Sequence, residues 1–169
     1  MGTEERMALL AEYARRVPGI DADDLTTMLQ VDHYAERVYA TIDKYLEGLC
    51  GLSVSRFKVL RTLFHDPDHC LTPAELAGRV YLTRASMTSA LDGLERMGYV
   101  RRTPHPVDRR MISVHLTPEG IALMEEILPA HYREVLAAFG VLTKADRTVL
   151  LKLYEKLLAG LGDLPGSRT

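Results

Sequence analysis

Small and short polar side chains occupy one face of a predicted helix near the middle of the chain. Ala85, Ser86, Thr88 and Ser89 follow Arg84, and at about 100° per residue they lie opposite or beside the apolar stripe. Short polar side chains suit a DNA major groove, where they can meet base edges and thymine methyl groups. We therefore expect this face to read DNA sequence. The alternative is an ordinary exposed face with little charge.

A basic loop follows this helix. Asp108, Arg109 and Arg110 stand between two short segments that are expected to form strands. An arginine at the tip of such a loop can enter a minor groove, where narrow A·T-rich DNA concentrates negative potential. Asp108 is expected to hold the Arg110 guanidinium through a charge-assisted hydrogen bond. A solvated hairpin tip carrying a surface ion pair is the alternative.

The elements that position these residues form a helix, a turn, a second helix and a two-stranded hairpin. Thr72 is the expected N-cap of the first helix, with Glu75 closing a capping box, and Thr83 caps the second. Strands are expected at 99–102 and 111–116, and residues 103–110 are too rich in proline for either strand to extend through them. This order predicts a winged helix.

Apolar periodicity predicts further helices on both sides of the winged helix. They span residues 4–17, 21–49, 53–64, 117–139 and 143–161, with Pro129 expected to kink the fourth. The expected fold is mainly α with a small β-wing, in three parts. Residues 1–52 form N-terminal helices that dimerise together with 141–162, residues 53–117 form the winged helix-turn-helix DNA-binding domain, and residues 118–169 form C-terminal dimerisation helices.

The terminal helices carry more apolar surface than one small winged-helix core can cover. A two-fold homodimer, in which the first and last helices bury each other, would cover it. Its two recognition helices would read a pseudo-palindrome with half-sites about 10 bp apart. Helix N-termini at Ser53, Thr72 and Thr83 would add phosphate contacts to those of the arginines. A monomer with an extended core is the alternative.

One motif in the wing and the helix before it resemble a known family. Asp108-Arg109-Arg110, five further residues and Leu116-Thr117 match the D-x-R-x5-L-T signature of the MarR family of winged-helix regulators. The run from Leu82 to Glu95 resembles its recognition helix. The resemblance covers roughly residues 21–161. It implies a sequence-specific transcriptional regulator of double-stranded DNA, typically a repressor that a small aromatic or phenolic effector releases, with no cofactor.

The extra first helix and residues 127–131 resemble the urate-responsive, PecS-like branch of that family. This chain departs from that branch, because Tyr13 stands where the ligand-binding tryptophan is expected and Lys58, after Phe57, stands where an acid is expected. Urate is therefore not the expected effector, whereas Lys58 could attract an anionic one. The resemblance implies a pocket near Tyr13, His33, Phe57 and Lys58, and ordinary packing is the alternative for each.

Charge and composition are compatible with a cytoplasmic DNA-binding protein. The chain of 169 residues has a formal net charge of -2, but residues 79–110 hold seven arginines against three acids, a net +4. This local excess decides phosphate attraction, because charges are screened beyond about 10 Å. No run approaches the roughly 20 apolar residues that span a bilayer. The N-terminus has no signal-peptide character, and two cysteines give no disulfide framework.

Other functions have weaker support in the sequence. Cys50 at the end of a long helix could sense oxidation, and His65, His69 and Cys70 could be zinc ligands, but the spacing is irregular and a fourth ligand is missing. The chain shows no Gly-rich phosphate loop, nucleophile elbow or Cys-His pair close in sequence, so we expect no enzyme and assign no catalytic residue. A winged helix that binds only proteins stays open.

Overall fold

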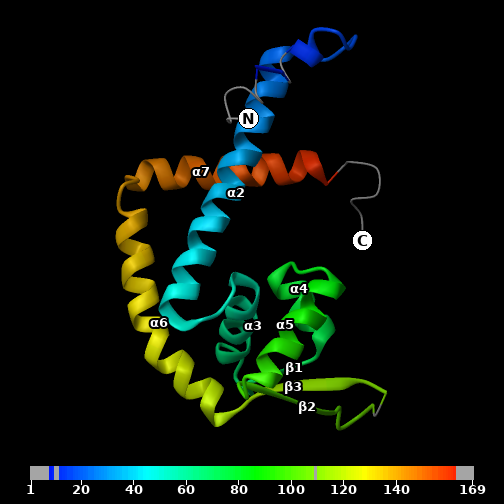
Figure 1. Cartoon of the computed structure of the whole chain (residues 1–169), viewed down its shortest axis with the longest axis vertical. Coiled ribbons are helices and arrows are strands. Elements are labelled where there is room, and N and C mark those ends of the chain that lie inside the picture. Colours follow the sequence, from blue (N-terminus) through cyan, green and yellow to red (C-terminus); the bar gives the residue numbers. More distant parts are fainter. Residues whose placement is uncertain (1–7, 10–11, 109, 163–169) are drawn as a thin grey trace. The chain divides into compact units, whose positions relative to one another are not determined.

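A computed structural model describes residues 8–9, 12–108 and 110–162 of the 169-residue chain. The chain divides into two compact units, Met1–Met124 and Glu125–Thr169. The elements, labelled as in Figure 1, are α2 (Ala22–Cys50), α3 (Val54–Phe64), β1 (Cys70–Leu71), α4 (Pro73–Val80), α5 (Arg84–Arg96), β2 (Val100–Pro104), β3 (Ile112–Leu116), α6 (Pro118–Phe139) and α7 (Lys144–Leu161). The prediction of a mainly helical fold with a small β-wing is confirmed.

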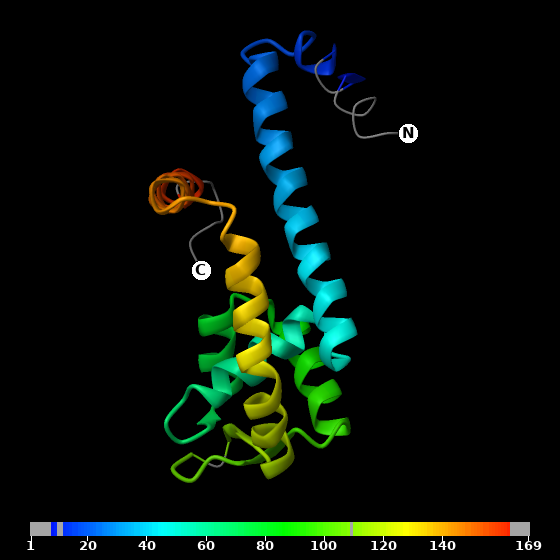
Figure 2. The same cartoon turned by 90° about the vertical axis from the view of Figure 1, so that its left-hand side faces the viewer.

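A short helical segment precedes the long helix α2. Residues 8–9 and 12–14 are helical, and the chain turns before Gly19, which has a φ of 83°. The rest of the helix expected at 4–17 lies partly outside the described residues. Asp21 caps α2 by accepting hydrogen bonds from the Asp23 and Asp24 backbone N–H groups, each 2.9 Å long. In Figures 1 and 2 the short segment lies at the end of α2 opposite to α3.

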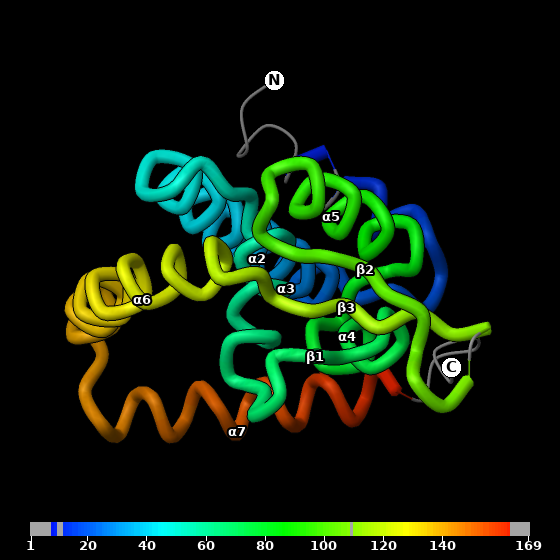
Figure 3. The backbone as a smooth tube through the Cα atoms, turned by 90° about the horizontal axis from the view of Figure 1, so that it is seen from below, coloured from blue at the N-terminus to red at the C-terminus, as the bar shows by residue number. Residues whose placement is uncertain are grey.

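Helices α3, α4 and α5 enclose the core of the first unit, and Figure 3 shows the three strands running beside them. The predicted apolar stripe of α5 is buried, with Met87, Ala90, Leu91 and Leu94 all at most 4% exposed. The predicted caps are also confirmed. Thr72 and Glu75 form the reciprocal capping box of α4, and the Thr83 hydroxyl accepts from the Ser86 N–H at 3.2 Å.

The sheet corrects the sequence prediction in two respects. It has three antiparallel strands in the order β1-β3-β2, and β1 was not predicted because two residues show no alternation. The proline-rich loop also begins later than expected, because β2 extends through Thr103 to Pro104, opposite Ile112. The N–H groups of His105 and Thr117 donate across the hairpin. The hydrogen-bonded positions of β2 are therefore odd-numbered, so the missing N–H of Pro104 faces outward from an edge strand.

Thr117 and Gly120 join the start of α6 to the wing. The Thr117 hydroxyl donates to the Gly98 carbonyl at 2.7 Å and accepts from the Gly120 N–H at 3.0 Å. The Thr117 N–H donates to the Tyr99 carbonyl at 3.1 Å. A Cβ at Gly120 would lie 2.3 Å from that same carbonyl oxygen, so only glycine allows this approach. The junction holds the first turn of α6 against the residues that precede β2.

Helix α7, in the second unit, buries none of its residues. Its predicted capping box is present, because Thr143 and Asp146 bond reciprocally. Pro129 lies inside α6, and the kink expected there stays a prediction. Among the described residues, no helix combines the length and apolar character that a membrane span requires.

Candidate nucleic-acid interface

The candidate reading face belongs to α5. Arg84, Ala85, Ser86, Thr88 and Ser89 are all exposed, as the sequence predicts for a groove-facing surface. The Thr88 hydroxyl donates to the Arg84 carbonyl at 3.1 Å, and the Thr83 hydroxyl donates to the Ser86 hydroxyl at 2.9 Å. These local bonds orient the hydroxyls and leave acceptor positions on their oxygens. The face can therefore present both donors and acceptors to base edges.

The three helix N-termini that were predicted to bind phosphate differ in whether a carboxylate already lies at the helix end. At α3, beside Ser53, the Val54 N–H donates to the Asp43 carboxylate at 2.6 Å. At α4, Thr72 is 7% exposed, and its N–H and hydroxyl both donate to Glu75, at 2.7 and 2.8 Å.

Only α5 has no such carboxylate at its N-terminus. It has no acid in its first turn, and none of the described hydrogen bonds brings a carboxylate to its start at Thr83. The positive end of its helix dipole therefore stays available for a phosphate. Ser53 and Thr72 stay predicted DNA contacts, at helix ends where Asp43 and Glu75 already accept from backbone N–H groups.

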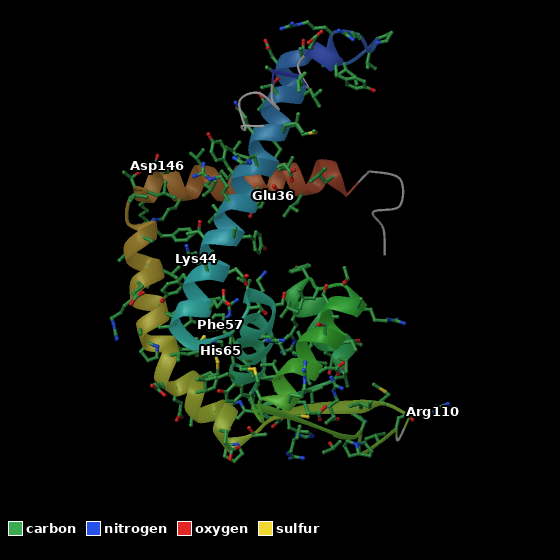
Figure 4. The ribbon with its side chains drawn as sticks, viewed as in Figure 1. Glu36, Lys44, Phe57, His65, Arg110 and Asp146 are labelled. Carbon is green, nitrogen blue, oxygen red and sulfur yellow. The ribbon has the colours of Figure 1, made fainter. Side chains whose placement is uncertain are left out.

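The wing presents the predicted ion pair. The Arg110 Nε and Nη2 donate to the two carboxylate oxygens of Asp108 at 3.1 and 3.2 Å, and the Arg110 N–H donates to Oδ1 at 3.0 Å. These bonds hold the pKa of Asp108 below its usual range. The Arg110 side chain is 91% exposed, and Figure 4 shows it at the tip of the β2–β3 hairpin. Arg109 lies outside the described residues.

Arg102 links the wing to α5, which the sequence reasoning missed. Its Nη2 lies 2.6 Å from the Asp92 carboxylate, its Nη1 lies 3.5 Å from Glu95, and its backbone N–H donates to Glu95 at 3.2 Å. Asp92 lies on the exposed face of α5, so Arg102 neutralises an acid beside the reading surface. Charge counting included Arg102 in the positive segment, but only the fold brings β2 beside α5 and reveals its partners.

The residues predicted for an effector pocket are separated within one chain. Phe57 is 2% exposed in the core, and the Lys58 ammonium lies 3.2 Å from the Tyr39 hydroxyl and 4.8 Å from the centre of its ring. Figure 4 shows Phe57 nearer to the C-terminal half of α2 than to Glu36, and His33 lies one turn farther away. Tyr13 precedes α2, whose N-terminus is about 25 Å of helix from Tyr39. The described residues of one chain therefore do not assemble this pocket.

The two alternative sensor chemistries, oxidation of Cys50 and a zinc site, are not supported by the described geometry. Burial raises the pKa of the Cys50 thiol, which lies 3.3 Å from the Leu46 carbonyl, so this cysteine is not activated. The His69 ring stacks on Phe64, and the Cys70 sulfur lies 3.7 Å from His115 Nε2. No group of three or more potential metal ligands occurs in the described part of the chain. The Cys70–His115 pair was missed because its members lie 45 positions apart in the sequence.

Comparisons with known proteins place this arrangement in a family. The MarR family model matches residues 52–112. Over 152 residues the chain is 36% identical to the HTH-type transcriptional repressor YetL of Bacillus subtilis, with 90% of each protein covered. The chain belongs to the MarR family. It is also 32% identical over 157 residues to the HTH-type transcriptional regulator PecS of Dickeya dadantii, with 89% of this chain and 92% of that protein covered.

Solved structures of MarR-family proteins show the same fold. Sco3205 of Streptomyces coelicolor, a MarR family regulator solved in complex with DNA, matches with a TM-score of 0.76 and 26% identity, over 89% of this chain and 93% of that one. AbsC of the same organism matches with a TM-score of 0.75 at 19% identity, over 88% and 100%. As a MarR-family member, the chain is a DNA-binding transcriptional regulator and not an enzyme. The predicted family and function are confirmed.

Proposed function

We propose that the chain is a cytoplasmic, homodimeric repressor that binds a pseudo-palindromic operator and is released by a small effector. The observation that carries this proposal is the α5 surface. Its short side chains are exposed, its N-terminus holds no carboxylate, and the Arg110 tip belongs to the hairpin that Arg102 ties to α5. Thr83, Arg84, Ala85, Ser86, Thr88 and Ser89 are the proposed contacts of α5 with the major groove and its phosphates.

The wing supplies the proposed minor-groove contact. Arg110, together with Arg109, would enter the groove next to each recognition helix, where a guanidinium meets concentrated negative potential. The Arg110→Ala variant should bind an operator at least about tenfold more weakly, because each half of the dimer loses one cation. The dependence of log K on log salt should also become shallower. Binding is measured by fluorescence anisotropy at several salt concentrations, on an operator selected from random DNA.

A matched control separates this contact from general loss of charge. Arg133 is an exposed arginine on α6, and Arg133→Ala changes the net charge by the same amount. This control should bind nearly as the wild type. Equal affinities of the Arg110→Ala variant and the wild type would contradict the assignment of the wing. Failure of the wild type to select any inverted repeat would contradict the dimeric repressor itself.

The proposed dimer is supported by α7. Its large apolar side chains are widely exposed, including Leu151 at 64%, Leu153 at 58% and Leu158 at 65%. Exposed apolar surface of this kind marks an interaction site, and a two-fold homodimer buries the same patch on both subunits. The pair Leu151→Glu and Leu158→Glu should yield monomers in sedimentation experiments. Lys152→Glu is the matched control on the same helix, and a monomeric wild type would refute the proposal.

The proposed effector is a small aromatic or anionic molecule. Lys58 supports this class, because its ammonium stands over the Tyr39 ring and offers both a positive charge and an aromatic partner. In the dimer, residues of the second subunit would complete the site, since one chain does not gather Tyr13, His33, Phe57 and Lys58. Benzoate and related aromatic carboxylates should release operator DNA from the wild type and less so from the Lys58→Gln variant. Equal release from both would exclude Lys58.

A further inference from the structure

The turn between α4 and α5 contains a tyrosine in an unusual backbone conformation. Tyr81 is the C-cap of α4, with φ 55° and ψ 43°, and its N–H donates to the Ala77 carbonyl at 3.0 Å. Its side chain is 93% exposed, more than any other large apolar side chain in the described part of the chain. Its phenol group makes no hydrogen bond among the described residues.

For the stability of the fold alone, a residue other than tyrosine would be favoured at this position. The left-handed region disfavours residues with a Cβ, and helices that end this way usually carry glycine or asparagine at that place. Burial does not compensate, because the ring is almost fully in water. A residue held against backbone preference at an exposed position points to a function rather than to stability.

The position of Tyr81 indicates which function this is. It lies two residues before Thr83, the N-cap of α5, and three before the exposed Arg84. A recognition helix enters the major groove with its N-terminal residues, so the residues just before it lie over the sugar-phosphate backbone at the groove edge. A tyrosine hydroxyl is one of the donors that proteins use on phosphate oxygens.

We propose that Tyr81 is a DNA-backbone contact, in which the phenol hydroxyl donates to a phosphate at the edge of the groove that α5 occupies. The inference rests on the proposed function of α5. The left-handed turn directs the ring out of the domain toward DNA, and the absence of a carboxylate at the α5 N-terminus leaves room for the phosphate. This contact fixes the register of the recognition helix on the duplex, and it carries no base preference of its own.

The test uses the full-length dimer and two variants with opposite expectations. Tyr81→Gly removes both the ring and the backbone strain, so its thermal unfolding midpoint should rise while its operator affinity falls. Tyr81→Phe keeps the ring and loses only the hydroxyl. Its stability should equal that of the wild type, and its affinity should fall by about tenfold, because hydrogen bonds to charged groups are strong. Tyr34→Phe, on an exposed tyrosine of α2, is the matched control and should change neither quantity.

The outcomes separate this inference from the proposed function. If the wild type binds the selected operator and Tyr81→Phe binds equally well, the hydroxyl contact is refuted while the repressor stands. If Tyr81→Gly unfolds at a lower temperature than the wild type, the ring stabilises the fold and the argument from strain is refuted. If the wild type binds no DNA, the proposed function fails first. Loss of affinity in both variants, with a more stable glycine variant, supports the contact.

Discussion

Replacing Gly120 with alanine tests whether the close approach of α6 to the wing holds the winged unit together. The new Cβ would lie 2.3 Å from the Tyr99 carbonyl oxygen and 3.1 Å from both the Tyr99 carbonyl carbon and Leu116 Cδ2. Ordinary contact begins at 3.4 Å, so the methyl group and the carbonyl must separate by about 1 Å. The carbonyl is not free to move, because its oxygen accepts the Thr117 N–H.

Several contributions determine the expected loss of stability. Forcing an extra carbon into a packed site costs about 1–3 kcal/mol. Separation of the junction also weakens the bonds of the Thr117 hydroxyl to Gly98 and Gly120, each worth about 1 kcal/mol. Alanine offsets about 1 kcal/mol of this loss through its better helix propensity. We expect a net destabilisation of about 1–4 kcal/mol, or a fall of roughly 2–16 °C in the unfolding midpoint.

A matched substitution in the same unit isolates the contact. Gly78 lies in α4 with nothing within 4 Å of a Cβ, so Gly78→Ala should stabilise the protein by about 0.5–1 kcal/mol. Both variants are compared with the wild type by urea unfolding at one protein concentration, because unfolding of a dimer depends on concentration. If Gly120→Ala is as stable as Gly78→Ala, the junction tolerates the methyl group and the packing argument is refuted.

Three further changes test charges around the winged unit. Arg102→Ala should weaken operator binding several-fold by exposing the Asp92 charge to phosphates. Adding Asp92→Ala to this variant should restore the affinity. If anisotropy titrations show no restored affinity in the double variant, Arg102 does not act by masking the Asp92 charge. The cap of α4 lowers the pKa of Glu75. The stability that the ionised Glu75 contributes is therefore present above its unfolded pKa of about 4.5 and is lost as pH falls through its lower folded pKa. Urea unfolding at pH 5 and pH 3 should therefore show that the Glu75→Gln variant loses less unfolding free energy than the wild type as pH falls. Burial, and then the nearby Arg101, lower the pKa of His115. The unfolded chain therefore binds the proton at a higher pH than the folded chain, and stability falls as pH drops below about 6.5. The His115→Gln variant should show a smaller fall in stability over this pH range.

Local sequence signals predicted the features that depend on residues close together in the sequence. The caps at Thr72 and Thr83 and the buried stripe of α5 follow from side chains three or four positions apart. The pairing of Asp108 with Arg110 was also predictable, because they lie only two positions apart in the sequence. Strand β1 was not, since its pairing with β3 joins Cys70 to His115 across 45 positions and leaves no periodic trace.

The predicted phosphate sites also depend on contacts between residues that are distant in the sequence. Ser53 gives the correct sequence signal for a helix N-terminus, but whether that end can bind an anion depends on a partner 10 positions earlier. Asp43 on α2 reaches the start of α3, and no motif in the sequence records this contact. Only the structure therefore shows that, among the described residues, the N-terminus of α5 binds no carboxylate whereas those of α3 and α4 do.

Asp108 provides the sharpest test of how the wing works, because its charge and its geometry should act in opposite directions. Its carboxylate repels phosphate, so removing it should strengthen non-specific attraction to any duplex. The same carboxylate binds Nε and Nη2 of Arg110, leaving the remaining N–H donors of the guanidinium directed away from the pair.

We therefore expect Asp108→Ala to bind random duplex DNA a few-fold more tightly and the selected operator more weakly. The ratio of the two affinities, measured at one salt concentration, should fall by about tenfold. An increase in both affinities by the same factor would mean that Asp108 contributes only charge. In that case Arg110 acts as an unoriented cation, and sequence preference resides in α5 alone.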